Sequence, residues 1–129
     1  MTLLLDTSTF LWYIGADRRL PPATRDLLRD PEHDVVLSVV SVWEIVVKAE
    51  LDRLHLAGPA WAYTKLQRDR HGFASLSLEE GALAHLGKLP PVHRDPFDRM
   101  LVCQAIEHDL TIVTNDDVLE RYPVKTVWD

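Results

Sequence analysis

The segment Leu3-Leu4-Leu5-Asp6-Thr7-Ser8, residues 3–8, decides which fold the sequence predicts. Three consecutive leucines are typical of a short strand that is buried on both faces, as the strands of a parallel sheet are. The apolar run ends at Asp6, and a helical pattern follows over roughly residues 8–14. A buried strand that passes directly into a helix predicts an α/β protein.

The same alternation continues to the end of the chain. Short apolar or β-branched runs predict further strands at residues 34–37, 73–76, 111–113 and 126–128. Helices are predicted over residues 23–29, 39–51, 61–70, 78–86, 96–108 and 116–121. This order predicts a central, mainly parallel sheet flanked by helices. No repeat or long linker divides the chain, so we expect one domain over residues 1–129.

Composition restricts the class of protein. Apolar residues make up 47% and charged residues 26% of the chain, as in an ordinary globular domain. No apolar run reaches the roughly 20 residues that a transmembrane helix needs, and the N-terminus has no basic signal-peptide region, so we expect a cytoplasmic protein without membrane contact. The single cysteine, Cys103, lies in an apolar helical pattern and is expected to be packed in the core.

The formal net charge of −6 bears on the choice of substrate. Proteins that hold nucleic acid through phosphate contacts alone are usually basic, so this charge argues against a simple DNA- or RNA-binding module. It argues less against a metal-dependent nuclease, because bound cations offset the charge of the carboxylates around them.

Four acids stand where apolar runs end or where helices are expected to begin: Asp6, Glu44, Asp98 and Asp116. Carboxylates at strand ends and helix starts of an open α/β sheet can converge in one crevice. A cluster of oxygen ligands is what Mg²⁺ or Mn²⁺ requires, and these ions dominate phosphate chemistry. Their placement makes the sequence readable as a metal-dependent enzyme that acts on phosphates.

Each acid also has a purely structural explanation. Asp6 and Asp116 could cap the helices that follow them. Asp95-Pro96 is a strong helix start, and Asp98, three residues after Asp95, resembles the second member of a capping box. His93, beside two prolines, is more simply a loop residue than a base. Taken singly, none of these residues identifies an active site.

Glu44 has two interpretations that depend on where its helix begins. If the helix begins at Ser41, Ser41 and Glu44 form a capping box and need no further role. If it begins near Ser38, Glu44 lies in the second turn of a strongly apolar segment, where a carboxylate is costly unless it is paired or bound to a metal ion. Lys48, four residues on, would supply an ion pair.

The contexts of the four acids together resemble those of PIN-domain ribonucleases, in particular the VapC-like toxins of bacterial type II toxin–antitoxin systems. Order and spacing agree along essentially the whole chain, although residues 51–76 carry no signature of the family. The matching segments are LLLDTS (3–8), SVVSVWEI (38–45), HRDPFDRML (93–101) and IVTND (112–116). The block at residues 93–99 is the most specific of them.

The resemblance implies a PIN-like three-layer sandwich and an endoribonuclease with four catalytic acids: Asp6, Glu44, Asp98 and Asp116. Asp6 and Asp98 are expected to be the principal ligands of Mg²⁺, with Mn²⁺ as the alternative. The other two acids are expected to bind directly or through water. Asp95, Thr7 and Thr114 are expected to assist. The adjacent Asp117 leaves the assignment of the fourth acid open by one residue. Asp116 is preferred because it keeps the family's spacing from the preceding strand.

The resemblance also implies partners. The family suggests a small cognate antitoxin that inserts a segment into the acidic site, an RNA substrate and a homodimer. Basic residues near the acids are candidate contacts for the RNA phosphates: Arg94, Arg99 and Lys48. Aromatic residues are candidate dimer contacts: Trp12, Tyr13 and Trp61.

Three alternatives have to be weighed against this interpretation. A PIN fold kept only for partner binding would be a non-catalytic interaction domain. A receiver-like phosphoacceptor domain has a similar length, but usually carries paired acids after its first strand and a lysine after its last main strand. A phosphohydrolase with an aspartyl nucleophile would have Asp-x-Asp after its first strand, where this chain has Asp6-Thr7-Ser8.

Overall fold

Strands and helices alternate along the whole chain in the computed structural model, which describes residues 1–129. The strands are β1 (Thr2–Leu5), β2 (Asp34–Ser38), β3 (Ala74–Leu76), β4 (Thr111–Val113) and β5 (Lys125–Val127). The α-helices are α1 (Thr7–Ile14), α2 (Pro22–Arg29), α3 (Val39–Glu50), α4 (Ala60–Arg70), α5 (Glu80–Leu83) and α6 (Pro96–His108). Two short 3-10 helices complete the set, η1 (Leu86–Lys88) and η2 (Leu119–Arg121).

The five strands form one sheet in which every neighbouring pair is parallel, in the order β3-β2-β1-β4-β5. β1 lies at the centre, with Leu3 paired to Val35 of β2 and Leu4 paired to Ile112 of β4. The chain builds outward from β1 to β3 and then returns to the other side of β1 with β4. The strand order therefore reverses between β1 and β4, and open α/β sheets bind ligands beyond the carboxyl ends of the strands at such a point.

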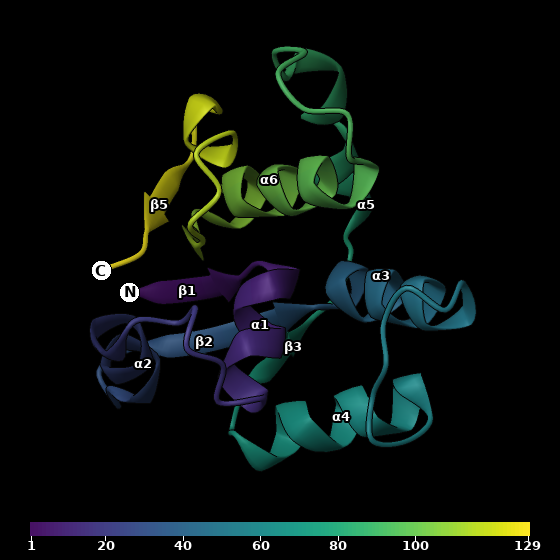
Figure 1. Cartoon of the computed structure of the whole chain (residues 1–129). Coiled ribbons are helices and arrows are strands. Elements are labelled where there is room, and N and C mark those ends of the chain that lie inside the picture. The colour runs from purple at the N-terminus through teal and green to yellow at the C-terminus, as the bar shows by residue number, and fades with distance from the viewer.

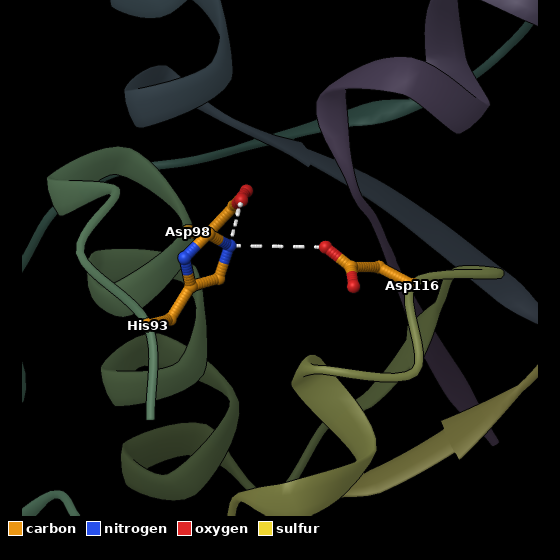
Figure 2. Close-up of side chains that lie close together, drawn as sticks. All are labelled: His93, Asp98 and Asp116. Carbon is orange, nitrogen blue, oxygen red and sulfur yellow. Dashed lines mark ion pairs between the residues drawn. The ribbon is translucent and has the colours of Figure 1, made fainter. Parts of the chain in front are cut away.

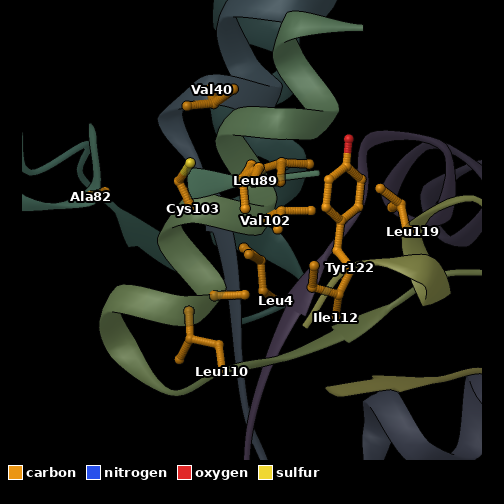
Figure 3. Packing of buried hydrophobic residues seen from close by; sticks show 12 residues of the cluster. Leu4, Val40, Ala82, Leu89, Val102, Cys103, Leu110, Ile112, Leu119 and Tyr122 are labelled. Carbon is orange, nitrogen blue, oxygen red and sulfur yellow. The ribbon is translucent and has the colours of Figure 1, made fainter. Parts of the chain in front are cut away.

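Helices cover both faces of this sheet (Figure 1). Successive side chains of a strand point to opposite faces, so Leu4 packs with Leu101 and Val102 of α6, whereas Leu3 and Leu5 pack with the cluster that contains Phe10 of α1. A strand covered on both faces needs an apolar residue at every position, which explains the three leucines. Figure 3 shows the cluster between the sheet and α6. The prediction of a three-layer sandwich is confirmed.

Two predicted helices differ in the structure. The helix predicted over residues 78–86 is divided into α5 and η1, and Gly81 and Gly87 weaken a continuous helix in this stretch. The helix predicted over residues 116–121 is a turn followed by η2. There the carboxylate of Asp116 accepts the N–H of Val118, and Pro123 prevents extension of the helix.

Several single residues can be compared with their predicted environments. Cys103 is buried in α6, as expected. Tyr13 was a candidate dimer contact, and this prediction is wrong because its ring is buried beside Phe73. Trp12 is half-buried and packs edge-on against Trp128, with ring centroids 6.0 Å apart. The structure contains no helix with both the length and the apolar content needed to cross a membrane.

Candidate active site

One cleft brings together the acids that the sequence singled out. Asp6 directly follows β1, Asp116 follows β4, Glu44 lies in the helix after β2, and Asp98 lies in the first turn of α6. The cleft has a volume of about 430 Å³, and none of its lining residues is hydrophobic. Its lining consists of Asp6, Thr7, Ser8, Glu44, Lys48, Asp95, Asp98, Asn115, Asp116 and Asp117. It lies beyond the carboxyl ends of the strands, where the reversal of strand order predicts a ligand site.

Asp6 is buried and held by two hydrogen bonds. Its Oδ1 accepts the N–H of Thr9 at 2.7 Å, which caps α1, and its Oδ2 accepts the hydroxyl of Thr114 at 2.5 Å. Thr114 Oγ1 also accepts the N–H of Asp116 at 3.0 Å, so one hydroxyl joins two of the acids. Burial raises the pKa of Asp6, and these hydrogen bonds offset only part of that effect.

Glu44 lies in the second turn of α3, because the helix begins at Val39 with Ser38 as its N-cap. The alternative start at Ser41, with a capping box to Glu44, is therefore wrong. The Glu44 carboxylate is buried and accepts the hydroxyl of Thr7 at 2.7 Å and the ammonium of Lys48 at 2.5 Å. These two donors offset the cost of burying its charge.

Lys48 is held by the same contact. Burial lowers the pKa of its ammonium, but the hydrogen bond and charge of Glu44 outweigh that effect, and the net pKa is raised. The side chain is 43% exposed and also lines the cleft. Lys48 therefore has one buried partner in the protein and a face toward any anion in the cleft.

The ionised form of Asp98 is strongly disfavoured in the cleft. Burial raises its pKa to about 7, with further contributions from the charges of Asp95, Glu44 and Asp6 that His93 only partly offsets. Asp95 is the N-cap of α6, because its Oδ1 accepts the N–H groups of Phe97 at 2.9 Å and Asp98 at 3.4 Å. A carboxylate so placed favours either a proton or a bound cation.

His93 lies in the cleft region, although the sequence indicated only a loop residue. Its Nε2 is 3.0 Å from Asp98 Oδ2 and 3.8 Å from Asp116 Oδ2. Dashed lines in Figure 2 mark both contacts. His93 lies in the irregular loop before α6, and its ring reaches Asp98 in the first turn of that helix, a contact that no periodicity reports. The available signal was the position of His93 at the head of the most specific block, residues 93–99.

Only some of the remaining predicted residues line the cleft. Asp116 is half-buried and faces His93, whereas Asp117 is exposed at the edge of the cleft. The guanidinium of Arg99 donates to the carbonyl oxygen of Leu86 at 3.3 Å. Arg94 is exposed, and neither arginine lines the cleft. Their proposed contacts with RNA phosphates stay predictions.

The carboxylates of the cleft fit a divalent cation. His93 Nε2 and one carboxylate oxygen each of Asp98 and Asp116 lie within 4.8 Å of one another. Asp6 and Glu44 add buried carboxylates to the same cleft. Carboxylate oxygens are the ligands that Mg²⁺ and Mn²⁺ prefer, and a bound cation would relieve the mutual repulsion that raises the pKa of Asp98.

Comparison with known proteins identifies the family. Residues 3–125 match the model of the PIN domain. The chain belongs to the PIN-domain family. This PIN domain is 29% identical to Ribonuclease VapC22 of Mycobacterium tuberculosis over an alignment of 133 positions that covers 98% of each protein. The family match confirms the resemblance inferred from the acidic segments and excludes the receiver-like and aspartyl-phosphohydrolase alternatives.

Solved structures confirm the fold. The PIN domain superposes on a chain of VapBC2 from Rickettsia felis, crystallised with a promoter DNA fragment, with a TM-score of 0.73, 16% identity and full coverage of both chains. A chain of DNA-bound VapBC from Salmonella typhimurium gives a TM-score of 0.69 and 19% identity over 98% of this chain and 97% of that one. PIN nucleases typically depend on metal ions, and the donor set of this cleft agrees with that dependence.

Proposed function

We propose that this PIN domain is a metal-dependent endoribonuclease that acts as the toxin of a toxin–antitoxin pair. The observation that carries the proposal is the convergence of acids from four separate segments in one cleft without an apolar lining. The high pKa of Asp98 supports it, because the carboxylate needs a compensating cation to be ionised at neutral pH. The likeness to Ribonuclease VapC22 supports RNA as the substrate.

Asp6 and Asp98 are the proposed principal ligands, and Glu44 and Asp116 complete the site directly or through water. Mg²⁺ is the expected ion and Mn²⁺ the alternative. When bound, a divalent ion offsets the charge of the phosphodiester and lowers the pKa of an attacking water. One or two ions are compatible with this donor set.

The protein's own contribution is to hold these carboxylates in fixed positions before RNA binds. Thr9 and Thr114 fix Asp6, and Thr7 and Lys48 fix Glu44. Groups fixed in this way require little rearrangement during the reaction, which is how enzymes gain from electrostatic stabilisation. Asp95 contributes as the cap that fixes the first turn of α6 and hence Asp98. Thr7, Thr114 and Asp95 are thus proposed to assist as supports of the acids.

RNA is proposed to enter this acidic cleft with help from the basic residues Lys48, Arg94 and Arg99. The protein carries a net charge of −6, so these contacts alone cannot give strong binding. Cations in the cleft would supply the remaining attraction for phosphate. We therefore expect RNA binding to depend on the divalent ion as well as on monovalent salt.

A small cognate antitoxin is proposed as the partner that blocks the cleft. Clustered carboxylates are a natural target for an arginine, which can bind a carboxylate through two hydrogen bonds. The structural likeness to chains of VapBC complexes agrees with such a partner. We further propose that the protein is cytoplasmic and acts as one domain over residues 1–129.

A homodimer is proposed through the exposed apolar residues of α3. Trp43 is 56% exposed and packs edge-on against Phe97 of α6, with ring centroids 4.8 Å apart, and Val39 lies one turn earlier on the same helix face. Trp61 on α4 is a separate exposed candidate. Light scattering of Trp43→Asp and Trp61→Asp tests this assignment, since a monomer is expected for the first variant and a dimer for the second.

The alternative is a non-catalytic PIN domain that only binds partners. Induced expression of the wild type and of Asp6→Asn in bacterial cells, followed by mapping of RNA cut sites, separates the two functions. The nuclease proposal predicts growth inhibition and new RNA ends for the wild type, and neither for Asp6→Asn. Growth inhibition that survives Asp6→Asn and Asp98→Asn, without new RNA ends, would establish the binding function instead.

A further inference from the structure

Three acids in the cleft, two of them buried and Asp98 half-buried, share a pattern: each is approached by a side-chain donor. Thr114 donates to Asp6, and Thr7 and Lys48 donate to Glu44. Asp98 has no threonine or lysine beside it, and the group in this position is the imidazole of His93, whose Nε2 lies 3.0 Å from Oδ2 (Figure 2).

The second nitrogen of the ring decides what His93 can do. Nδ1 accepts the backbone N–H of Asp95 at 3.3 Å. In a neutral imidazole one nitrogen accepts and the other carries the hydrogen. The hydrogen is therefore on Nε2, which donates to Asp98 Oδ2. Asp95 acts twice in this arrangement, since its carboxylate caps α6 and its N–H selects the tautomer of His93.

We propose that His93 is a positioning residue that holds the Asp98 carboxylate in its metal-binding orientation by donating the Nε2 hydrogen to Oδ2. The proposal rests on the proposed metal-dependent function. Asp98 needs such a donor because the negative charges of Asp95, Glu44 and Asp6 all act on it. The hydrogen bond occupies Oδ2 and leaves Oδ1 free of this contact.

Direct ligation by His93 Nε2 is the competing role. It would require the hydrogen to move to Nδ1 and the hydrogen bond from the N–H of Asp95 to be lost, because a ligating nitrogen must present its lone pair. Ligating histidines typically donate their second nitrogen's hydrogen to an acceptor, whereas here that nitrogen faces a donor. The geometry thus favours the donor role.

Two variants of His93 and one control separate these roles. His93→Gln places an amide N–H near the position of Nε2, whereas His93→Asn is too short and loses that donor. His85→Asn is the matched control, because His85 Nε2 also contacts a carboxylate, Glu107 at 3.1 Å, and is similarly exposed, but Glu107 does not line the cleft.

Isothermal titration calorimetry with Mn²⁺ and with Mg²⁺ measures the effect on the protein of residues 1–129. Loss of a partner that orients a ligand typically costs about 10- to 100-fold in metal affinity. We expect that loss for His93→Asn, near wild-type affinity for His93→Gln, and no change for His85→Asn. Circular dichroism in EDTA should show the wild-type fold for all three variants, so that a change in affinity reports on the ion site and not on loss of folding.

The proposal is overturned if His93→Asn binds both ions as tightly as the wild type. It is also overturned if His93→Gln is as weak as His93→Asn, which would indicate direct ligation. Nitrogen-15 NMR of the ion-free protein at pH 8 gives a test without metal: the proposal requires hydrogen on Nε2, and hydrogen on Nδ1 would refute it. A wild type that binds neither ion but shows the Nε2 tautomer would refute the metal-dependent function and leave the His93–Asp98 hydrogen bond standing.

Discussion

Replacing Asp98 by asparagine is expected to stabilise the ion-free protein, although it removes a proposed ligand. The pKa of Asp98 is raised from 3.8 to about 7, first by burial and then by the neighbouring acids. At about 1.4 kcal/mol per pKa unit, this difference corresponds to about 4 kcal/mol lost when the folded protein carries an ionised Asp98. Asparagine has nearly the same shape and no charge, so the variant avoids this loss.

The sign and the pH range follow from the direction of the change. A carboxyl group whose pKa is higher in the folded state holds its proton more tightly there, so ionisation costs stability. The cost is absent below about pH 4, grows between pH 4 and pH 7, and is complete above pH 7. For a pKa of about 7 against 3.8, linkage gives a gain for Asp98→Asn of about 4 kcal/mol at pH 8 and about 2 kcal/mol at pH 5.

Urea unfolding in EDTA at the two pH values measures this gain. Asp117→Asn is the control, because Asp117 lines the same cleft but is exposed, and its replacement is expected to change stability by less than about 0.5 kcal/mol. A variant Asp98→Asn that is no more stable than the wild type at pH 8 would refute the raised pKa of Asp98 as a source of instability. A gain of equal size at both pH values would contradict the assignment of the effect to ionisation.

Three further predictions concern the ion and the core. Mg²⁺ at 100 times its Kd should stabilise the wild type by about 2.7 kcal/mol and so raise its melting temperature relative to EDTA, with a much smaller effect on Asp6→Asn. Equal melting temperatures of the wild type in both conditions would argue against a metal site. Tyr122→Phe should stabilise the protein by about 1 kcal/mol in urea unfolding, because the buried hydroxyl of Tyr122 has no hydrogen-bond partner. A clear loss of stability in this variant would show that a partner exists. Gln104→Leu should lower the free energy of unfolding by about 1 to 3 kcal/mol, because the buried side-chain amide accepts a hydrogen bond from Ser38 Oγ and donates one to the carbonyl oxygen of Ser77. An unchanged midpoint of urea unfolding would show that these hydrogen bonds contribute nothing to stability.

Local signals predicted the elements that carry the acids. The run Leu3–Leu5 specifies a strand because its faces meet two different layers, and Asp95-Pro96 specifies the start of α6 because the acid caps and the proline fits the first turn. The order of the strands is a property of distant pairings. The sequence did not predict it, since the same alternation of strands and helices allows several orders, and only the structure gives β3-β2-β1-β4-β5.

The sequence predicted which acids form the site, but it specified less well the contacts that hold these acids in place. The sequence left two starts for α3, and only the structure places Ser38 as the cap and hence Glu44 in the second turn. The contacts of Thr7 with Glu44 and of Thr114 with Asp6 join residues far apart in the chain. His93 was missed because its role depends on the path of an irregular loop, which composition and periodicity do not describe.

Cleavage of RNA by the purified protein tests directly whether the acidic cleft is the site of a metal-dependent ribonuclease. Wild type, Asp98→Asn and Asp117→Asn are incubated with total RNA in Mg²⁺ or in EDTA, and the products are separated by gel electrophoresis. Discrete fragments are expected for the wild type and for Asp117→Asn in Mg²⁺. None are expected for either protein in EDTA, and none for Asp98→Asn in either condition. Equal cleavage by the wild type and Asp98→Asn, or cleavage by the wild type that persists in EDTA, would contradict that assignment of the cleft.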